Sequence, residues 1–349
     1  MKAIYKLLFA CLVVLAVAAP SHAVIVEFNG CLVNTFYDWE KDGHKGGISV
    51  FDAYEFYLLG RVDVAQDVMA NFEVRFEHVD EWVELRQGYI KWSIAEPMSL
   101  VMGRFYMPIG RYGLRYYGTQ RKVVSEPYPM RMVVVTPCQD TGIMLKGQVD
   151  RFGYAVAVVN GLGEEYIGDI KPRNAGQRTD NNDYKTVGGR LSYSPVDELE
   201  VGVSYMNGKY DDAGEKNLQV ADVDLLVEVK DFSLEGEWAQ SISDDLETDD
   251  EITTSGFYVQ ASYKLLRDQH GINFIEPVVR YESIDPGREM VDRFSLGPES
   301  TGRVTGVSAG LGVSPREHFL IKAEYRITTE EIDPQLSNNA VYVQFCADF

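Results

Sequence analysis

Cysteine is scarce in this chain of 349 residues, which contains four. Cys11 lies in an apolar N-terminal segment, so the rest of the chain holds only Cys31, Cys138 and Cys346. Three thiols are too few to build a fold from disulfides. The stability of the protein must therefore come from a large hydrogen-bonded fold.

Long apolar runs are also missing from most of the chain. Beyond residue 24, no stretch of 18 or more apolar residues occurs. A transmembrane helix needs about 20 such residues to cross the hydrocarbon core of a bilayer. If the chain enters a membrane, it does so without helices, which leaves a soluble β-protein or a closed barrel.

Basic residues are outnumbered, with 33 Lys and Arg against 53 Asp and Glu, and the formal net charge is -20. Such acidity argues against nucleic acid as a partner. Histidine is rare as well: beyond residue 23, His44, His78, His270 and His318 are scattered, without the spacing of a metal or catalytic site. The sequence therefore predicts neither a metal nor another cofactor.

The N-terminus has the features of a secretory signal peptide. Lys2 and Lys6 precede an apolar stretch at 7–19, and Ala23 ends a cleavage site of small residues. The alternative, a membrane-anchoring helix, is disfavoured because 13 apolar residues cannot span about 30 Å of hydrocarbon. We expect 1–23 to be removed, which leaves 24–349 and changes the net charge from -20 to -22.

From residue 24 onward the dominant period is two, which is typical of β-strands. In one clear example Ala323 and Tyr325 face one way, and Lys322 and Glu324 face the other. Segments of this kind number 16, with edges uncertain by two to four residues: 25–38, 54–65, 68–78, 85–94, 98–105, 138–149, 151–160, 184–194, 198–207, 219–229, 231–240, 253–265, 273–284, 301–314, 317–328 and 338–349.

The links between these segments alternate in length. Short links such as 65–67, 95–97 and 150 follow the even-numbered segments, and long links such as 106–137 and 161–183 follow the odd-numbered ones. This asymmetry predicts an all-β protein, a 16-stranded antiparallel transmembrane β-barrel with short periplasmic turns and long extracellular loops. A soluble β-sandwich or propeller would also alternate, but neither accounts for the signal peptide and the alternating link lengths together. We expect the outer membrane of a Gram-negative bacterium.

The last segment closes the predicted barrel. Val341, Phe345 and Phe349 fall on its lipid-facing row, and Cys346 falls on its inward row. Cys31 falls on the inward row of the first strand, which neighbours the last strand in a closed barrel. The sequence does not decide between a disulfide across this seam and two free thiols.

Two motifs have simpler interpretations than their patterns suggest. Residues 306–310 match the G-x-S-x-G motif of serine hydrolases, but alternation runs straight through them, so we expect a strand and no enzyme. The carboxylates of 241–252 could hold a divalent cation or simply form a solvated external loop, because the spacing of an EF-hand is absent.

The third long link, 106–137, is basic against the overall trend. It carries five Lys and Arg against the single acid Glu126, a net +4, so the rest of the chain after residue 23 carries about -26. Arginine forks that face a lumen would select anions. The alternative is a surface loop that contacts lipopolysaccharide phosphates, which would leave 133–135 in water. The predicted constriction residues are Arg104, near the end of the preceding strand, and five residues of this link: Arg111, Arg115, Arg121, Lys122 and Arg131.

A resemblance supports this interpretation over some forty residues. The run Gly103-Arg104-Phe105 with Pro108 and Gly110, then Glu126-Pro127, then Asp140-Thr141-Gly142, resembles the phosphate-selective porin O and P family. The resemblance implies a trimeric, 16-stranded, anion-favouring diffusion channel with its third loop at the constriction.

This chain departs from that family in its inward rows, which mix both charges where the family has basic rows. The predicted pore-lining residues are Arg61, Glu73, Arg75, Lys91, Lys264, Arg280, Lys322 and Arg326. We therefore expect a porin that passes small hydrophilic solutes and ions, anion-favouring through its third loop, with lipid and lipopolysaccharide as surroundings. The alternative is a barrel that serves as a scaffold or sleeve for a partner protein or anchors lipopolysaccharide.

Overall fold

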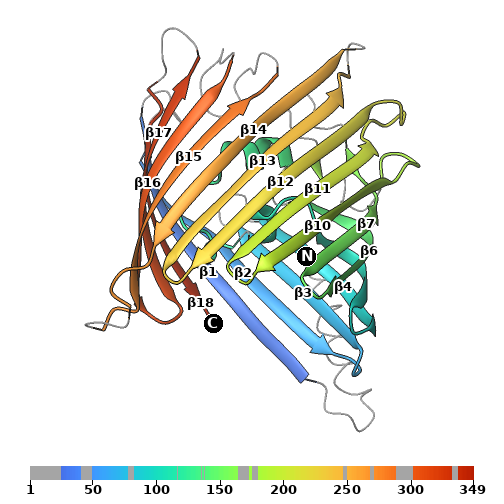
Figure 1. The fold of residues 1–349 in the computed structure, drawn as a ribbon, viewed down its shortest axis with the longest axis horizontal. Helices are drawn as coiled ribbons and strands as arrows, with labels where there is room; N and C mark the ends of the chain where they lie inside the picture. Colours follow the sequence, from blue (N-terminus) through green and yellow to red (C-terminus); the bar gives the residue numbers. More distant parts are fainter. Residues whose placement is uncertain are drawn as a thin grey trace.

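The protein is a closed barrel of sixteen antiparallel strands in the computed structural model (Figure 1). The structure describes residues 25–40, 49–77, 82–115, 117–134, 136, 138–163, 173–174, 180–246, 250–267, 271–287, 302–331 and 337–349. The predicted signal peptide, 1–23, lies outside the described residues. The predicted fold class and strand number are confirmed.

Each strand of the barrel pairs with its sequence neighbours, and β1 pairs with β18 to close the ring. The strands are β1 (Ile25–Trp39), β2 (Val50–Asp63), β3 (Val68–Glu77), β4 (Trp82–Ala95), β5 (Met98–Tyr106), β6 (Gln139–Val149), β7 (Phe152–Val159), β10 (Thr186–Val196), β11 (Leu199–Lys209), β12 (Asn217–Val229), β13 (Phe232–Asp244), β14 (Glu251–Tyr263), β15 (Phe274–Asp285), β16 (Val304–Arg316), β17 (Phe319–Glu330) and β18 (Ala340–Asp348). A separate pair, β8 (Leu162–Gly163) and β9 (Arg173–Asn174), lies in the predicted fourth long link.

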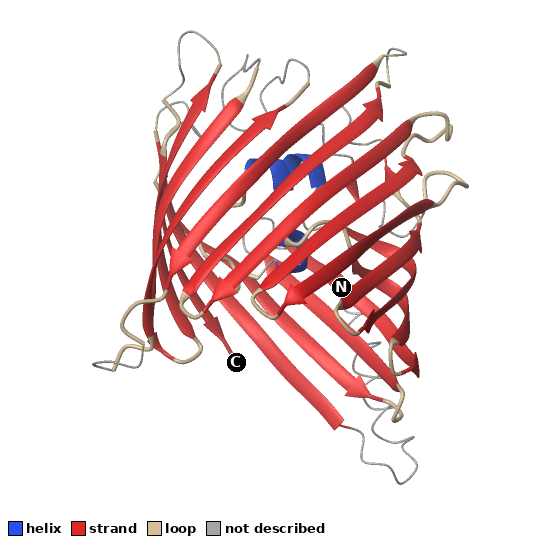
Figure 2. Ribbon diagram, in the orientation of Figure 1, coloured by secondary structure: helices blue, strands red, loops and turns tan. Residues whose placement is uncertain are grey.

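Alternation assigns the two faces of the wall. Along β17, Ala323 and Tyr325 are exposed on the outer face, and Lys322, Glu324 and Arg326 are buried inside. The same alternation of exposed and buried residues repeats along β11 and β12, and the strands of the wall are tilted (Figure 2). An apolar outer band with a charged interior is the arrangement that a bilayer imposes on a barrel with an aqueous lumen.

The seam between β1 and β18 is completed by the last residue of the chain. The Phe349 N–H donates to the Gly30 carbonyl at 3.1 Å, and the Gly30 N–H donates to the Phe349 carbonyl at 3.0 Å. The Phe349 ring covers Gly30 so closely that a Cβ there would lie 2.2 Å from it. Cys31 and Cys346 are buried free thiols at this seam, so the structure contains no disulfide between them.

The G-x-S-x-G segment at 306–310 lies within β16 and pairs in register with both β15 and β17. The strained strand-to-helix elbow of a hydrolase is therefore absent from this segment. Ser308 is buried on the inner wall.

Candidate pore constriction

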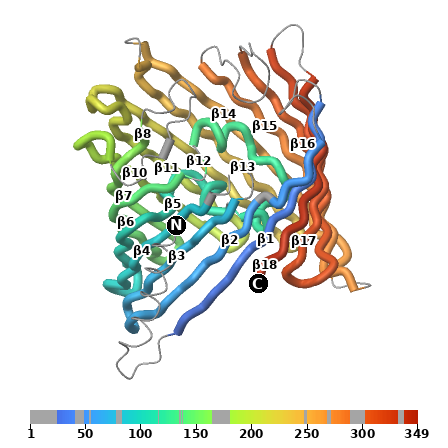
Figure 3. Tube along the Cα trace, turned by 180° about the vertical axis from the view of Figure 1, so that it is seen from behind, coloured from blue at the N-terminus to red at the C-terminus, as the bar shows by residue number. Residues whose placement is uncertain are grey.

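The link between β5 and β6, residues 107–138 (loop three), crosses the interior of the barrel (Figures 2 and 3). It contains a 3-10 helix, Tyr112–Arg115, and a short π-helix, Met130–Val134. Its backbone and side chains hydrogen-bond to β3, β11, β13, β15 and β17, which are distributed around the ring. These contacts require the loop to run inside the wall.

Loop three has an apolar side that packs against the inner wall. Met130, Met132, Val133 and Val134 are each at most 4% exposed, and they belong to one cluster with wall residues such as Ile284. Burying a side chain of this size stabilises by about 1.5–3 kcal/mol. The cost of exposing these residues to water explains why this end of the loop stays against the wall.

Glu237 on β13 holds the start of the loop. Its carboxylate accepts hydrogen bonds from the backbone N–H groups of Arg111 at 2.6 Å and Tyr112 at 2.8 Å. Gly110 has a φ of 66°, and a Cβ there would lie 2.3 Å from Glu237 Oε1. Glycine is needed at this position because the backbone approaches the carboxylate in a left-handed conformation.

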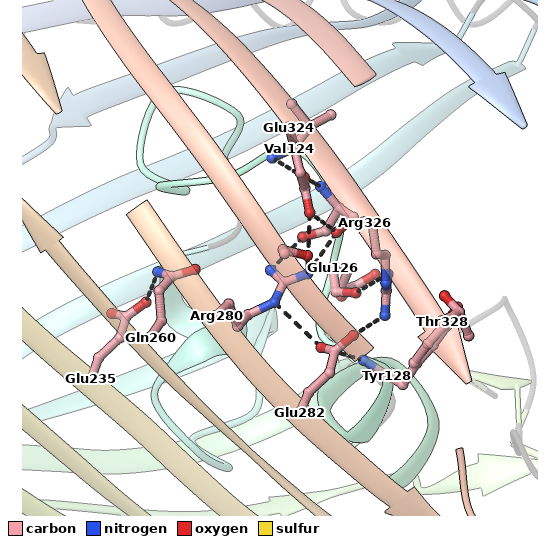
Figure 4. Close-up of polar contacts among 12 residues, drawn as sticks. Val124, Glu126, Tyr128, Glu235, Gln260, Arg280, Glu282, Glu324, Arg326 and Thr328 are labelled. Atoms are coloured by element: carbon pink, nitrogen blue, oxygen red, sulfur yellow. Dashed lines mark hydrogen bonds and ion pairs between the residues drawn. The ribbon is translucent and has the colours of Figure 1, made fainter. Parts of the chain in front are cut away.

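Glu324 on β17 holds the middle of the loop in the same manner. Its carboxylate accepts hydrogen bonds from the N–H groups of Val124 at 2.8 Å and Ser125 at 2.7 Å, and from Ser125 Oγ at 2.6 Å. The Arg280 guanidinium lies 3.6 Å from Glu324 and donates to the Ser125 carbonyl at 2.8 Å (Figure 4). Both polar groups of the Ser125 backbone are thereby satisfied by wall side chains.

Further along, Glu282 and Arg326 hold the loop beside the π-helix. Glu282 accepts the Tyr128 N–H at 3.3 Å and forms an ion pair with Arg326 (Figure 4). The Arg326 guanidinium lies 3.6 Å from the centre of the Tyr128 ring and also donates to the Glu126 carbonyl. Wall carboxylates thus bind loop N–H groups, and wall cations bind loop carbonyls.

Two more contacts fasten the turn at 117–121. Lys322 donates through Nζ to the Gly118 carbonyl at 2.6 Å. Tyr117 donates through its hydroxyl to Glu73 at 2.6 Å, and Tyr106 donates to the other oxygen of Glu73 at 2.8 Å. Burial, and then the charge of Glu73, raise the pKa of Tyr117 well above its ordinary value, so its hydroxyl remains a donor.

Four of the six predicted constriction residues line one recess between loop three and the wall: Arg111, Arg115, Arg121 and Lys122. Glu235, Gln260 and Arg280 line its wall side. Arg111 pairs with Glu200 at 2.6 Å, and Lys122 pairs with Glu276 at 2.7 Å. Arg115 is exposed and has no ion-pair partner within the described residues.

The other two predicted constriction residues lie elsewhere. Arg104, on β5, is directed to Glu84 at 3.4 Å and Gln139 at 3.2 Å. Arg131 is exposed on the π-helix and is not among the residues that line the recess. The positions of charged residues along the sequence do not determine which of them line the same recess, because this depends on how the loop folds.

The predicted pore-lining residues also divide. Lys322, Arg326 and Arg280 lie on inward rows but are at most 3% exposed, because loop three covers them. This corrects the expectation that Lys322 and Arg326 face an open pore: their charges hold the loop. Glu73 is fully buried for the same reason.

The remaining pore-lining predictions lie nearer the short turns, with one exception. Arg61 is half-exposed beside Asp63, Lys91 is half-buried, and Lys264 lies over the Phe274 ring. Arg75 is the exception, since it is buried against Glu55 at 2.9 Å.

Sequence reasoning missed the residues that fasten loop three. Glu237 and Glu282 lie on the inward rows of their strands, but nothing local in the sequence shows that each binds a backbone about 125 to 155 positions away. The sequence signal that could have indicated these contacts is the set of carboxylates on the inward rows, which face a basic loop. Along the described ranges no helix is long and apolar enough to cross a membrane, and no three His, Cys, Asp or Glu are grouped as metal ligands.

The closed sixteen-stranded barrel with a charged interior and an internal third loop defines an outer-membrane porin. Residues 57–347 match the family model described as "Putative beta-barrel porin-2, OmpL-like", and the chain belongs to this family. The family shown is therefore a β-barrel porin family of the Gram-negative outer membrane, and the narrower resemblance to the phosphate-selective porin O and P family is not confirmed.

A curated relative is an uncharacterised protein of Aquifex aeolicus (strain VF5), 21% identical over 311 residues, which cover 79% of this chain and 70% of the relative. Among solved structures, the chain is similar to an anion-selective porin from Comamonas acidovorans, with a TM-score of 0.68, 12% identity, and coverage of 93% of this chain and 100% of that one. Salmonella typhi OmpF, solved in complex with daunomycin, gives 0.66 at 13% identity, with coverage of 93% and 97%. The trimer form of Vibrio cholerae OmpT gives 0.65 at 11% identity, with coverage of 94% and 100%. At these identities the likeness shows the fold alone.

Proposed function

We propose that this porin is a passive diffusion channel for small hydrophilic solutes and ions, and that the basic recess makes it favour anions. The observation that carries the proposal is the way charge is distributed around loop three. Glu237, Glu282 and Glu324 are occupied by loop N–H groups and wall cations, while Arg115 in the recess has no ion-pair partner in the described part of the chain.

This distribution supports an anion preference although the inward rows carry both charges. A carboxylate already bound by two N–H groups or a guanidinium attracts a passing cation less than a free one, because its charge is largely compensated. An exposed guanidinium with no partner keeps its full attraction for anions. The Comamonas acidovorans porin, described as anion-selective, has the same fold and is consistent with this selectivity. Phosphate specificity is not part of the proposal.

The proposal includes three features of the mature protein. Export removes residues 1–23, the barrel assembles as a homotrimer as described for the trimer form of Vibrio cholerae OmpT, and its outer rim contacts lipopolysaccharide. Loop three then forms the constriction of each protomer.

The test is the zero-current potential of single channels in a planar bilayer under a salt gradient. Replacing Arg115 and Arg121 with Glu should move this potential toward that of a cation channel, since both side chains line the recess. The control is Lys230→Glu, which reverses one positive charge in the exposed turn between β12 and β13, as each of the two substitutions does in the recess, and should leave the potential unchanged. An unchanged potential in the double variant would contradict the role of the recess.

A further inference from the structure

Two lysines of the wall, Lys91 on β4 and Lys146 on β6, flank β5. Lys91 pairs in register with Val101 of β5, and Lys146 pairs with Ser99. Residues paired directly across antiparallel strands face the same side of the sheet, and residues two apart on one strand share a side. Val101 is buried in the cluster that loop three forms with the inner wall. Both lysines are therefore directed into the barrel.

The two lysines lie where the lumen opens below loop three, on the side of the short turns. Met144, on the row of Lys146, belongs to the buried cluster. Gln148 and Ser93, the next residues of the two lysine rows toward the short turns, are exposed. Lys91 and Lys146 are themselves half-buried. A solute in the lumen can therefore contact both side chains without entering a closed cavity.

Neither lysine has a partner of opposite charge. Within the described residues, no hydrogen bond or ion pair joins Lys91 or Lys146 to another group. Apart from burial, the charge of Lys91 is what acts on Lys146, and no carboxylate accompanies it. Other inward cations differ: Lys122, for example, pairs with Glu276. The sector formed by β4, β5 and β6 thus carries two uncompensated positive charges close together.

This arrangement favours a doubly charged anion. Two ammonium groups repel each other, and a dianion between them is attracted by both, whereas a monoanion gains half of that attraction. Each ammonium group has three N–H donors, and the hydroxyl of Ser99, which lies on the strand between the two lysines, is a further donor.

The lysine pair is separate from the recess at loop three. The wall residues of the recess lie on β13, β14 and β15. Around the ring, β7, β10, β11 and β12 separate these strands from β6 on one side, and β16, β17, β18, β1, β2 and β3 separate them from β4 on the other. The two basic positions therefore face the lumen from different sides.

We propose that Lys91 and Lys146, with the hydroxyl of Ser99 between them, bind small dianions in preference to monoanions of similar size. This inference rests on the proposed function, because the anion must reach the lysines through the lumen.

The experiment measures block of the chloride current at low ionic strength, where charges are screened least. The probes are sulfate and methanesulfonate, sulfur oxyanions of similar size that carry two charges and one. In the wild-type channel sulfate should block at about tenfold lower concentration, the order expected when a second negative charge meets two ammonium groups in water-rich surroundings. Lys91→Gln and Lys146→Gln, which each remove one of these charges, should each lower the ratio to about threefold. Lys146→Arg, which keeps the charge, should retain it.

The matched control is Lys230→Gln, which removes one positive charge in the exposed turn between β12 and β13 and should keep the wild-type ratio. Equal block by the two anions in the wild type, or a ratio that survives in both Lys91→Gln and Lys146→Gln, would overturn the inference. A ratio that is lost in Arg115→Gln but kept in both lysine variants would place the dianion in the recess and would also overturn it.

If the purified barrel conducts no current, the proposed function fails, and calorimetric titration of the barrel with the same two anions decides the inference. Tighter binding of sulfate that Lys146→Gln weakens supports it. Equal binding of the two anions, or a preference that Lys146→Gln leaves intact, overturns it.

Discussion

Glu324→Ala should release the middle of loop three without unfolding the barrel. Glu324 is 3% exposed, and its carboxylate receives three hydrogen bonds, two from the N–H groups of Val124 and Ser125 and one from Ser125 Oγ. A hydrogen bond to a charged group contributes about 1.5–3 kcal/mol, and the variant leaves two buried N–H groups and the nearby Arg280 without this partner. Removing one member of such a buried set costs about 3–5 kcal/mol.

This cost falls on the loop, because the backbone pairing of β17 with β16 and β18 does not involve the Glu324 side chain. Contacts at Glu237 and Lys322 continue to hold the earlier part of the loop. We therefore expect a barrel that still migrates as a folded species on an unheated denaturing gel, with larger single-channel conductance and more open-channel noise. Glu324→Gln, which keeps one acceptor oxygen, should be intermediate.

Glu317→Ala is the matched control, since it removes a carboxylate that is exposed in a short turn. Its conductance and noise should equal those of the wild type. If Glu324→Ala also gave wild-type conductance and noise, the reasoning that wall carboxylates hold loop three would be refuted.

Three further perturbations test other parts of the account. Gly30→Val should reduce the yield of folded barrel, measured by heat-modifiable migration, because a Cβ there would lie 2.2 Å from the Phe349 ring at the closing seam. Lys322→Met should increase open-channel noise, since it removes a buried donor that holds the turn of loop three at 2.6 Å. The raised pKa of Tyr117 means that its contribution is fully present below the unfolded pKa of about 10 and is lost only as the pH rises beyond it. The stability advantage of the wild-type barrel over Tyr117→Phe, measured by heat-modifiable migration, should therefore be constant from neutral pH to about pH 9 and shrink above about pH 10.

The strands could be predicted because their signal is local. Alternation along β17 assigns Tyr325 to the outside and Arg326 to the inside from five neighbouring residues. The predicted end of a strand falls too early where its residues become mostly polar. The predicted strand ends at residue 240, whereas β13 continues to Asp244. Backbone pairing with β14 extends the strand there, and such pairing leaves little trace in side-chain composition.

The interior path of loop three was predictable only in outline. Its basic charge and apolar residues indicated the lumen, but the contacts that fix it join positions far apart, such as Val124 and Glu324. No periodicity relates residues 200 positions apart. For this reason Lys322 and Arg326 were predicted to line the pore, although the structure places loop three over them.

The most direct test of the central claim is the zero-current potential of the wild-type channel under a potassium chloride gradient. The account predicts conductance steps in a planar bilayer and a potential of the sign given by chloride permeating faster than potassium. A channel that gave no conductance steps, or whose potential had the sign of a cation-selective pore, would contradict it.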